Sequence, residues 1–175
     1  MSTKSLVCLI ALITLQLSPC LGEYQTFPIW HYNASLDFGG KNVTVETRPI
    51  TSDLYSTMRS ILFRGSSAGD WGSIYLLDSR QPAYSVPMED TLRSLMISSC
   101  KAVRINPGSI GNISGLIAKA DARVEHGFGQ TCYGGIVQLT SPGPQENTFF
   151  VVIGHFTDES LNEAFVKTAN IYYTG

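Results

Sequence analysis

The sequence predicts an α+β fold, a single domain whose mostly antiparallel sheet carries a middle helix and a C-terminal helix packed on it. Three stretches point to this class. Residues 115–125 alternate apolar and charged side chains, with the period of a half-buried strand. From residue 88 the apolar period lengthens to that of a helix. Residues 148–154 are apolar on both faces, as in a central strand, and lead into a second helical pattern.

The first 22 residues are predicted to be a secretory leader that is removed. Lys4 supplies a basic start, residues 6–17 an apolar run too short to span a bilayer, and residues 20–22 a small-residue cleavage site. The alternative is that Cys20 becomes a lipidated first residue. We therefore expect residues 23–175 to be an exported chain, extracellular or at the cell surface, with no transmembrane segment after leader removal.

The exported chain is weakly acidic. The sequence has 12 Lys and Arg and 14 Asp and Glu, and the leader takes away only Lys4, which leaves 11 basic and 14 acidic residues and a net charge of −3. The basic residues are scattered, which argues against nucleic acid and against anionic membrane surfaces as partners. A chain of about 150 residues buries a core of its own, so one domain is expected.

The N-terminal part is predicted to form a β-hairpin followed by a loop. Residues 33–38 and 42–48 read as two strands joined around Gly39-Gly40, which is typical of a tight turn between paired strands. Residues 58–63 fit a short helix or a strand, and their periodicity does not decide between the two. Residues 64–73 are rich in Gly and Ser and indicate a loop, with a short strand at 74–78 after it.

The middle of the chain is predicted to be a helix over residues 88–99, with acidic residues in its first turn. Asn106-Pro107-Gly108 indicates a turn, and a strand is expected at 133–139. The final helix is expected to begin after Thr157 or Asp158 and to run to Tyr172.

The strand at 115–125 places different side chains on its two faces. The apolar face carries small residues, and because alanine fills little volume, whatever covers it must approach closely. The final helix, which contains Ala164 and Ala169, is the expected cover. The other face is charged and is expected to be exposed. The apolar face is Leu116, Ala118, Ala120, Ala122 and Val124, and the charged face is Lys119, Asp121, Arg123 and Glu125.

Two cysteines, Cys100 and Cys132, remain after leader removal. In an oxidising compartment they are expected to form a disulfide. The alternative is a pair of metal ligands, but neither a second Cys-x-x-Cys nor a close histidine supports it. The sequence predicts no metal site and no cofactor.

Several other residues are candidates for modification or binding. Asn33, Asn42 and Asn112 stand in Asn-x-Ser/Thr sequons and are candidate glycosylation sites, with Asn112 the most accessible beside Gly111 in a turn. Trp71 lies in a predicted Gly- and Ser-rich loop, where it either contacts a ligand such as a sugar ring or a protein, or anchors the loop on the core.

The order of elements resembles that of the PsbP-like α/β/α sandwich. The likeness covers an early hairpin, a middle helix, a three-strand meander and a long helix after a buried strand, and it depends most on residues 148–173. Such domains serve mainly in assembly, as scaffolds or as binding modules, so the resemblance implies a non-enzymatic role.

No catalytic motif is present, and no residue is assigned as catalytic. We therefore expect a binding or structural module whose partner is an extracellular protein or a glycan. The alternative is a small extracellular hydrolase, in which His155 or His126 is the base and Asp121 or Asp158 its carboxylate partner.

Overall fold

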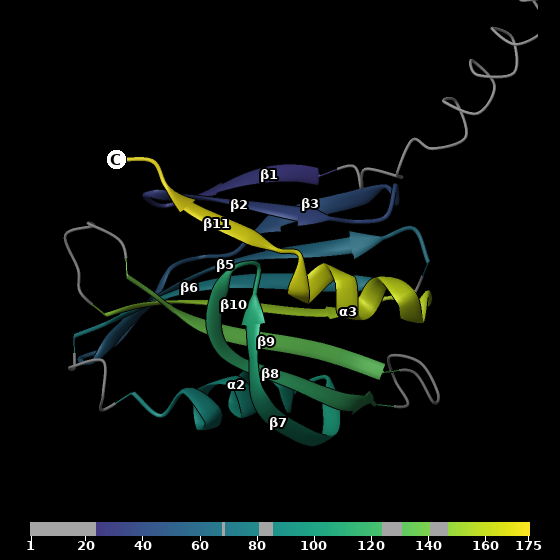
Figure 1. Cartoon of the computed structure of the whole chain (residues 1–175). Coiled ribbons are helices and arrows are strands. Elements are labelled where there is room, and N and C mark those ends of the chain that lie inside the picture. Colours follow the sequence, from purple (N-terminus) through teal and green to yellow (C-terminus); the bar gives the residue numbers. More distant parts are fainter. Residues whose placement is uncertain (1–23, 68, 81–85, 124–130, 141–146) are drawn as a thin grey trace, which may run out of the picture.

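A computed structural model describes residues 24–67, 69–80, 86–123, 131–140 and 147–175. These residues form two antiparallel sheets and two helices (Figure 1). The small sheet consists of β1 (Tyr24–Ile29), β2 (Tyr32–Asp37) and β11 (Asn170–Tyr173). The large sheet consists of β3 (Val43–Thr47), β4 (Thr51–Ser52), β5 (Ser56–Gly65), β6 (Trp71–Ser79), β7 (Cys100–Ile110), β8 (Ile113–Ala122), β9 (Thr131–Leu139) and β10 (Thr148–His155). The helices are α2 (Met88–Met96) and α3 (Glu159–Lys167). The predicted class is therefore right in outline, although strands dominate and the second sheet is additional.

The large sheet has the strand order β3-β5-β6-β10-β9-β8-β7, with β4 paired to β5. Strand β10 is central, as its apolar sequence predicts: it pairs with β6 and β9, and all eight of its residues are buried. Residues buried on both faces of a sheet need covering layers on both sides. Those layers are the small sheet with α3 on one face and α2 on the other (Figure 1).

Helix α3 lies close to the sheet because β6 and β10 carry glycines beneath it. A Cβ atom added at Gly72 or Gly154 would lie 2.9 or 2.5 Å from ring atoms of Phe165, which occupies the space that these glycines leave. The Asp158 carboxylate accepts from the Ser160 amide and caps the helix, as predicted. Asn162 anchors the same helix to the end of β10, because its amide group hydrogen-bonds both the N–H and the carbonyl of Phe156.

The expectation that the final helix covers the alanines of β8 is wrong. Ala118, Ala120 and Ala122 are buried in one cluster with Leu92 and Met96 of α2. Helix α3 packs on the opposite face, because its buried residues belong to the cluster of the small sheet. The close approach that alanine predicts is nevertheless present, since a Cβ atom at neighbouring Gly134 would lie 2.7 Å from the Met96 sulfur.

The predicted N-terminal hairpin is also wrong. Both strands form, but β2 pairs with β1 and β11 whereas β3 pairs with β5. Gly39 and Gly40 have φ values of 58° and 73° and lead the chain from the small sheet to the edge of the large one. A glycine pair signals a turn but does not specify that the strands on either side of it pair.

Residues 58–63, for which helix and strand were both open, lie within β5. Two further segments differ from expectation. Pro107 lies in β7 instead of a turn, and the chain reverses at Gly111 and Asn112. A proline is tolerated there because β7 is an edge strand with one unpaired side. The last helix ends at Lys167, and Tyr172 belongs to β11, where Ile171 faces the core.

Within the described part of the chain, neither helix has the length and apolar content to cross a membrane. Residues 1–22, which include the predicted leader and Cys20, lie outside the described residues, as do Val124, Glu125 and His126.

Candidate functional site

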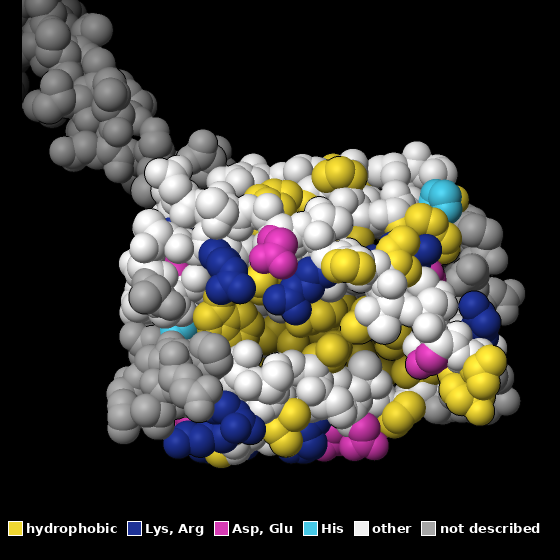
Figure 2. Space-filling model, turned by 180° about the vertical axis from the view of Figure 1, so that it is seen from behind, with side chains coloured by type: hydrophobic (Ala, Val, Ile, Leu, Met, Phe, Trp, Pro, Cys, Tyr) yellow, Lys and Arg dark blue, Asp and Glu magenta, His cyan; other side chains and the backbone are white. Residues whose placement is uncertain are grey.

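The face of the large sheet that carries α2 is only partly covered. Helix α2 packs over β7, β8 and β9, so side chains of β5 and β6 on this face line an open groove beside it. The alternation of β6 points four side chains into the groove, Trp71, Ser73, Tyr75 and Leu77. Figure 2 shows this groove as a hollow with an apolar floor and basic side chains along one rim.

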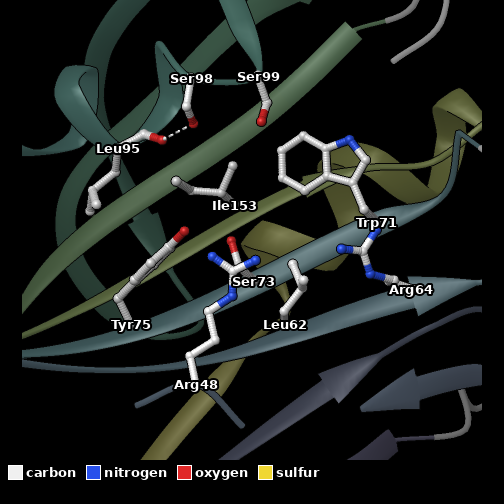
Figure 3. A pocket seen from close by; sticks show the side chains of 10 residues that line it. All are labelled: Arg48, Leu62, Arg64, Trp71, Ser73, Tyr75, Leu95, Ser98, Ser99 and Ile153. Atoms are coloured by element: carbon white, nitrogen blue, oxygen red, sulfur yellow. Dashed lines mark hydrogen bonds between the residues drawn. The ribbon is translucent and has the colours of Figure 1, made fainter. Parts of the chain in front are cut away.

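The groove consists of two adjoining pockets that share Tyr75 and Leu95. The first, which we call the arginine pocket, has a volume of about 220 Å³ and is drawn in Figure 3. The second, the α2 pocket, has a volume of about 370 Å³. The arginine pocket is lined by Arg48, Leu62, Arg64, Trp71, Ser73, Tyr75, Leu95, Ser98, Ser99 and Ile153. The α2 pocket is lined by Ser56, Met58, Tyr75, Leu77, Pro87, Asp90, Thr91, Ser94 and Leu95.

Two guanidinium groups reach the arginine pocket from neighbouring strands. Arg48 follows β3, and its backbone N–H donates to the carbonyl of Ser60 at 3.1 Å. The Arg48 Nε atom lies 3.8 Å from Glu46 Oε1, and both side chains are about half exposed, so this ion pair contributes little. Arg64 of β5 is exposed and has no ion pair with any described residue. No carboxylate lines this pocket among the described residues, and the only ion pair formed by either arginine within that part of the chain is the weak one with Glu46.

Trp71 is the first residue of β6, so the loop predicted over residues 64–73 is wrong at both ends: β5 runs to Gly65 and β6 begins at Trp71. It is half-buried, and its indole stacks on the ring of His155 with 6.1 Å between centroids and 16° between planes. In Figure 3 the six-membered ring of the indole faces Ile153 and Ser99, whereas its nitrogen lies on the far side. The pocket therefore meets the apolar part of Trp71.

His155 ends β10 and is fully buried beneath Trp71. Its Nδ1 atom hydrogen-bonds the carbonyl of Gly69, which can only accept, so Nδ1 is the donor of this bond. Within the described residues Nε2 has no hydrogen-bond partner.

The carboxylates proposed as partners of His155 are used elsewhere or point elsewhere. Asp158 accepts from the backbone N–H and the hydroxyl of Ser160, and hydrogen bonds from this hydroxyl and this N–H lower its pKa. Asp121 is exposed on β8, on the face opposite the buried alanines. His31 lies at the other end of the molecule, where its Nδ1 atom is 3.2 Å from the carbonyl of Gly175. No His and carboxylate pair is therefore assembled among the described residues.

A buried ion pair holds the chain next to Trp71. The side chain of Asp70 is 1% exposed, and one of its oxygens lies 3.1 Å from Lys41 Nζ. The other oxygen accepts from the backbone N–H and the hydroxyl of Thr157, at 2.7 and 2.8 Å. Burial raises the pKa of Asp70, but the Thr157 hydrogen bonds and the Lys41 ammonium together lower that pKa below its ordinary value. Asp70 thereby ties the β5–β6 turn to the start of α3.

The expected disulfide is not present, and Cys100 and Cys132 are both buried free thiols. Strand β8 runs between the strands that carry them, because Cys100 pairs with Ala122 and Cys132 with Ala120. Two strand spacings amount to about 9.6 Å in a flat sheet, beyond the Cα separation of about 4.4–6.8 Å that a disulfide requires. The thiols still meet across the small alanines, and hydrogen bonding with Cys132 together with burial raises the pKa of Cys100.

The sequons differ in accessibility. Asn42, directly before β3, and Asn112, in the turn between β7 and β8, are exposed, whereas Asn33 is half-buried in the middle strand of the small sheet. On the charged face of β8, Lys119 lies over the ring of Tyr133 at 5.5 Å, and Asp121 and Arg123 are exposed. Among the residues that the structure describes, no three His, Cys, Asp or Glu side chains are grouped to hold a metal.

Sequence reasoning selected Trp71 but missed Arg48, Arg64 and Tyr75. The signal for Tyr75 was available, because alternation in residues 71–77 puts it on the same face as Trp71. The arginines could not be found in this way, since only the pairing of β3 and β5 brings them to one rim.

Comparison of the chain with protein-family models, with curated proteins and with solved structures found no match.

Proposed function

We propose that the protein is an exported binding module that holds an extracellular ligand, a glycan or a protein segment, in the groove between α2 and strands β5 and β6. The observation that carries this proposal is an open groove whose floor is aromatic and apolar and whose rim has two arginines without a carboxylate in the same pocket. A concave groove with aromatic and apolar side chains and a few convergent polar groups is the usual form of a ligand-binding site.

The arrangement favours binding over hydrolysis. The arginine pocket has hydroxyl groups, but its described lining includes neither a histidine nor a carboxylate, and the Ser98 hydroxyl donates to the carbonyl of Leu95 at 3.3 Å. A hydrolase that used His155 would need its buried Nε2 atom to reach a substrate proton, and that side chain has no exposed surface. Helices on both faces of the large sheet also suit the PsbP-like sandwich that the element order resembles, and such domains serve mainly as scaffolds or binding modules.

Saturation-transfer NMR with a panel of neutral saccharides, acidic saccharides and short peptides tests this proposal. We expect signals from at least one class of compound, and we expect the variant Ser98→Trp to abolish them, because Ser98 is exposed and a bulky ring there fills the arginine pocket. Ser114→Trp is the matched control, since Ser114 is equally an exposed serine but lies on β8 outside the groove. If no compound gives a signal that Ser98→Trp removes and Ser114→Trp keeps, the groove is not a binding site.

A further inference from the structure

We propose that the ligand of the groove is a short saccharide with one acidic sugar unit, whose carboxylate or sulfate lies between Arg48 and Arg64. This inference rests on the proposed function and assigns its ligand class and orientation. It follows from the charge of the arginine pocket, the aromatic floor and the opposite charge at the far end of the groove.

The charge of the arginine pocket selects an anion. Arg48 and Arg64 both line it, and no Asp or Glu among the residues that the structure describes does. A guanidinium group presents parallel N–H donors that match the oxygens of a carboxylate or sulfate. The only described carboxylate near either group is Glu46, at 3.8 Å from Arg48, and it is too exposed and distant to compete strongly with a bound anion.

The floor suits sugar rings. A pyranose has a face of C–H groups that packs on an aromatic ring and an edge of hydroxyls that needs hydrogen-bond partners. Trp71 and Tyr75 stand at opposite ends of the pocket in Figure 3, and their Cα atoms are about 13 Å apart along an extended strand, the span of a few sugar units. Hydroxyls line the groove between and beyond them, on Ser73, Ser94, Ser98, Ser99 and Thr91.

Two other occupants fit less well. An extended peptide is most often held by main-chain pairing with a free strand edge, but β6, which forms the floor, is already paired on both sides by β5 and β10. A lipid tail needs an enclosed apolar cavity, whereas both pockets open to solvent and carry several hydroxyl groups (Figure 2).

The two ends of the groove carry opposite charges, which limits the ligand to one acidic unit. Asp90, in the first turn of α2, lines the α2 pocket, and none of the described residues that line that pocket is basic. A second anionic unit placed there would be repelled, whereas the hydroxyls of a neutral sugar can donate to the Asp90 carboxylate. The acidic unit therefore lies at the arginine pocket and the neutral unit over Tyr75 toward Asp90.

Calorimetric titration with matched disaccharides tests the assignment. The probes are cellobiouronic acid against cellobiose, which differ by a carboxylate, and lactose 3′-sulfate against lactose, which differ by a sulfate. We expect at least one acidic member to bind about tenfold or more tightly than its neutral partner, as a charge-assisted hydrogen bond predicts. The pair that shows the difference tells carboxylate from sulfate.

Variants then locate the acidic group. Arg48→Gln and Arg64→Gln should each weaken binding of the acidic disaccharide about tenfold while leaving the neutral one unchanged. Arg104→Gln is the control, because Arg104 is also exposed but lies on the edge strand β7 and lines neither pocket. Asp90→Asn should increase the affinity for digalacturonate, in which the second unit is acidic as well.

The possible outcomes distinguish failure of this inference from failure of the proposed binding function. Two outcomes would show that Arg48 and Arg64 do not select an acid: equal affinity for the neutral and acidic disaccharides, or a loss of affinity in Arg104→Gln as large as in Arg48→Gln and Arg64→Gln. In either case the groove would still be a saccharide site. Binding of a peptide alone, in a manner sensitive to Ser98→Trp, would overturn the saccharide class and leave the binding function standing. Absence of any binding that is sensitive to Ser98→Trp would remove both.

Discussion

Asp70 is charged although its side chain is almost fully buried, and its pKa is lowered because the Thr157 hydrogen bonds and Lys41 outweigh the effect of burial. A carboxylate with a lowered folded-state pKa stabilises the protein above its unfolded-state pKa of about 3.9, and this contribution is lost as the pH falls through the folded-state pKa. We expect Asp70→Asn to lower the free energy of unfolding by about 1.5–3 kcal/mol at pH 7. The difference from the unaltered protein should shrink as the pH falls below about 3.9 toward the folded-state pKa, because the unfolded chain then binds a proton that the folded Asp70 carboxylate does not.

Urea unfolding at pH 7 and at pH 2.5 measures this difference. Asp121→Asn is the control, since Asp121 is exposed and its replacement should change the stability by less than about 0.5 kcal/mol. A loss that is equally large at both pH values would mean that the amide disturbs packing, and that the charge of Asp70 is not what stabilises the corner.

The site itself shows how far single residues can be interpreted from sequence. Trp71 was chosen because an indole in a Gly- and Ser-rich stretch is unusual, and the structure does place it in a groove. The loop predicted around Trp71 was wrong, because Gly65 lies in β5 and Gly72 lies in β6. Glycine at these positions permits close packing: a Cβ atom at Gly65 would lie 2.5 Å from Asp70 Cβ. Composition alone could not distinguish glycines that permit a turn from glycines that make room for a neighbour.

Among the elements, α3 and the strands beneath it fit together through Gly154 and Phe165. Phe165 is fully buried, and a Cβ atom at Gly154 would lie 2.5 Å from its Cδ1 atom, so neither group has space to move. We expect Gly154→Ala to destabilise the protein by about 1–3 kcal/mol through overpacking. In a Phe165→Leu background the same change should cost clearly less, because the smaller side chain relieves the contact.

The two single variants and the double variant form a cycle that thermal or urea unfolding can measure. A coupling energy of less than about 0.5 kcal/mol would show that the strand accommodates alanine without help from Phe165. The cycle would then contradict the view that glycines set the distance between α3 and the sheet.

At the scale of the whole molecule, the thiols report on global opening. Cys100 and Cys132 are 0% exposed, and the raised pKa of Cys100 keeps it protonated. We expect iodoacetamide to leave both unmodified in the folded protein and to modify both in denaturant without a reducing agent. For a chain that begins at Glu23, intact mass measures this as two added groups.

A protein that takes up no reagent in denaturant would contain the disulfide after all, and the strands that carry the cysteines would have to approach more closely than they do here. Rapid modification in the native state would show instead that β7 and β9 open without global unfolding. The same spectra of protein from its own host show whether the chain begins at Glu23 and whether glycans are attached at Asn33, Asn42 or Asn112.

The sequence by itself determined which segments are strands and helices wherever a local pattern was strong. The alternation of β8, the doubly apolar β10 and the capped, amphipathic start of α3 were all predicted, because side-chain periodicity and capping depend on near neighbours in the chain.

Only the tertiary structure decided which elements meet. It paired β3 with β5 and β2 with β11, placed α2 over the alanines, and separated the two cysteines by a strand. The groove has the same origin, since Arg48, Arg64 and Trp71 come together through strand register. Pairing of distant strands is governed by the burial of whole faces against one another, and no short window of sequence contains that information.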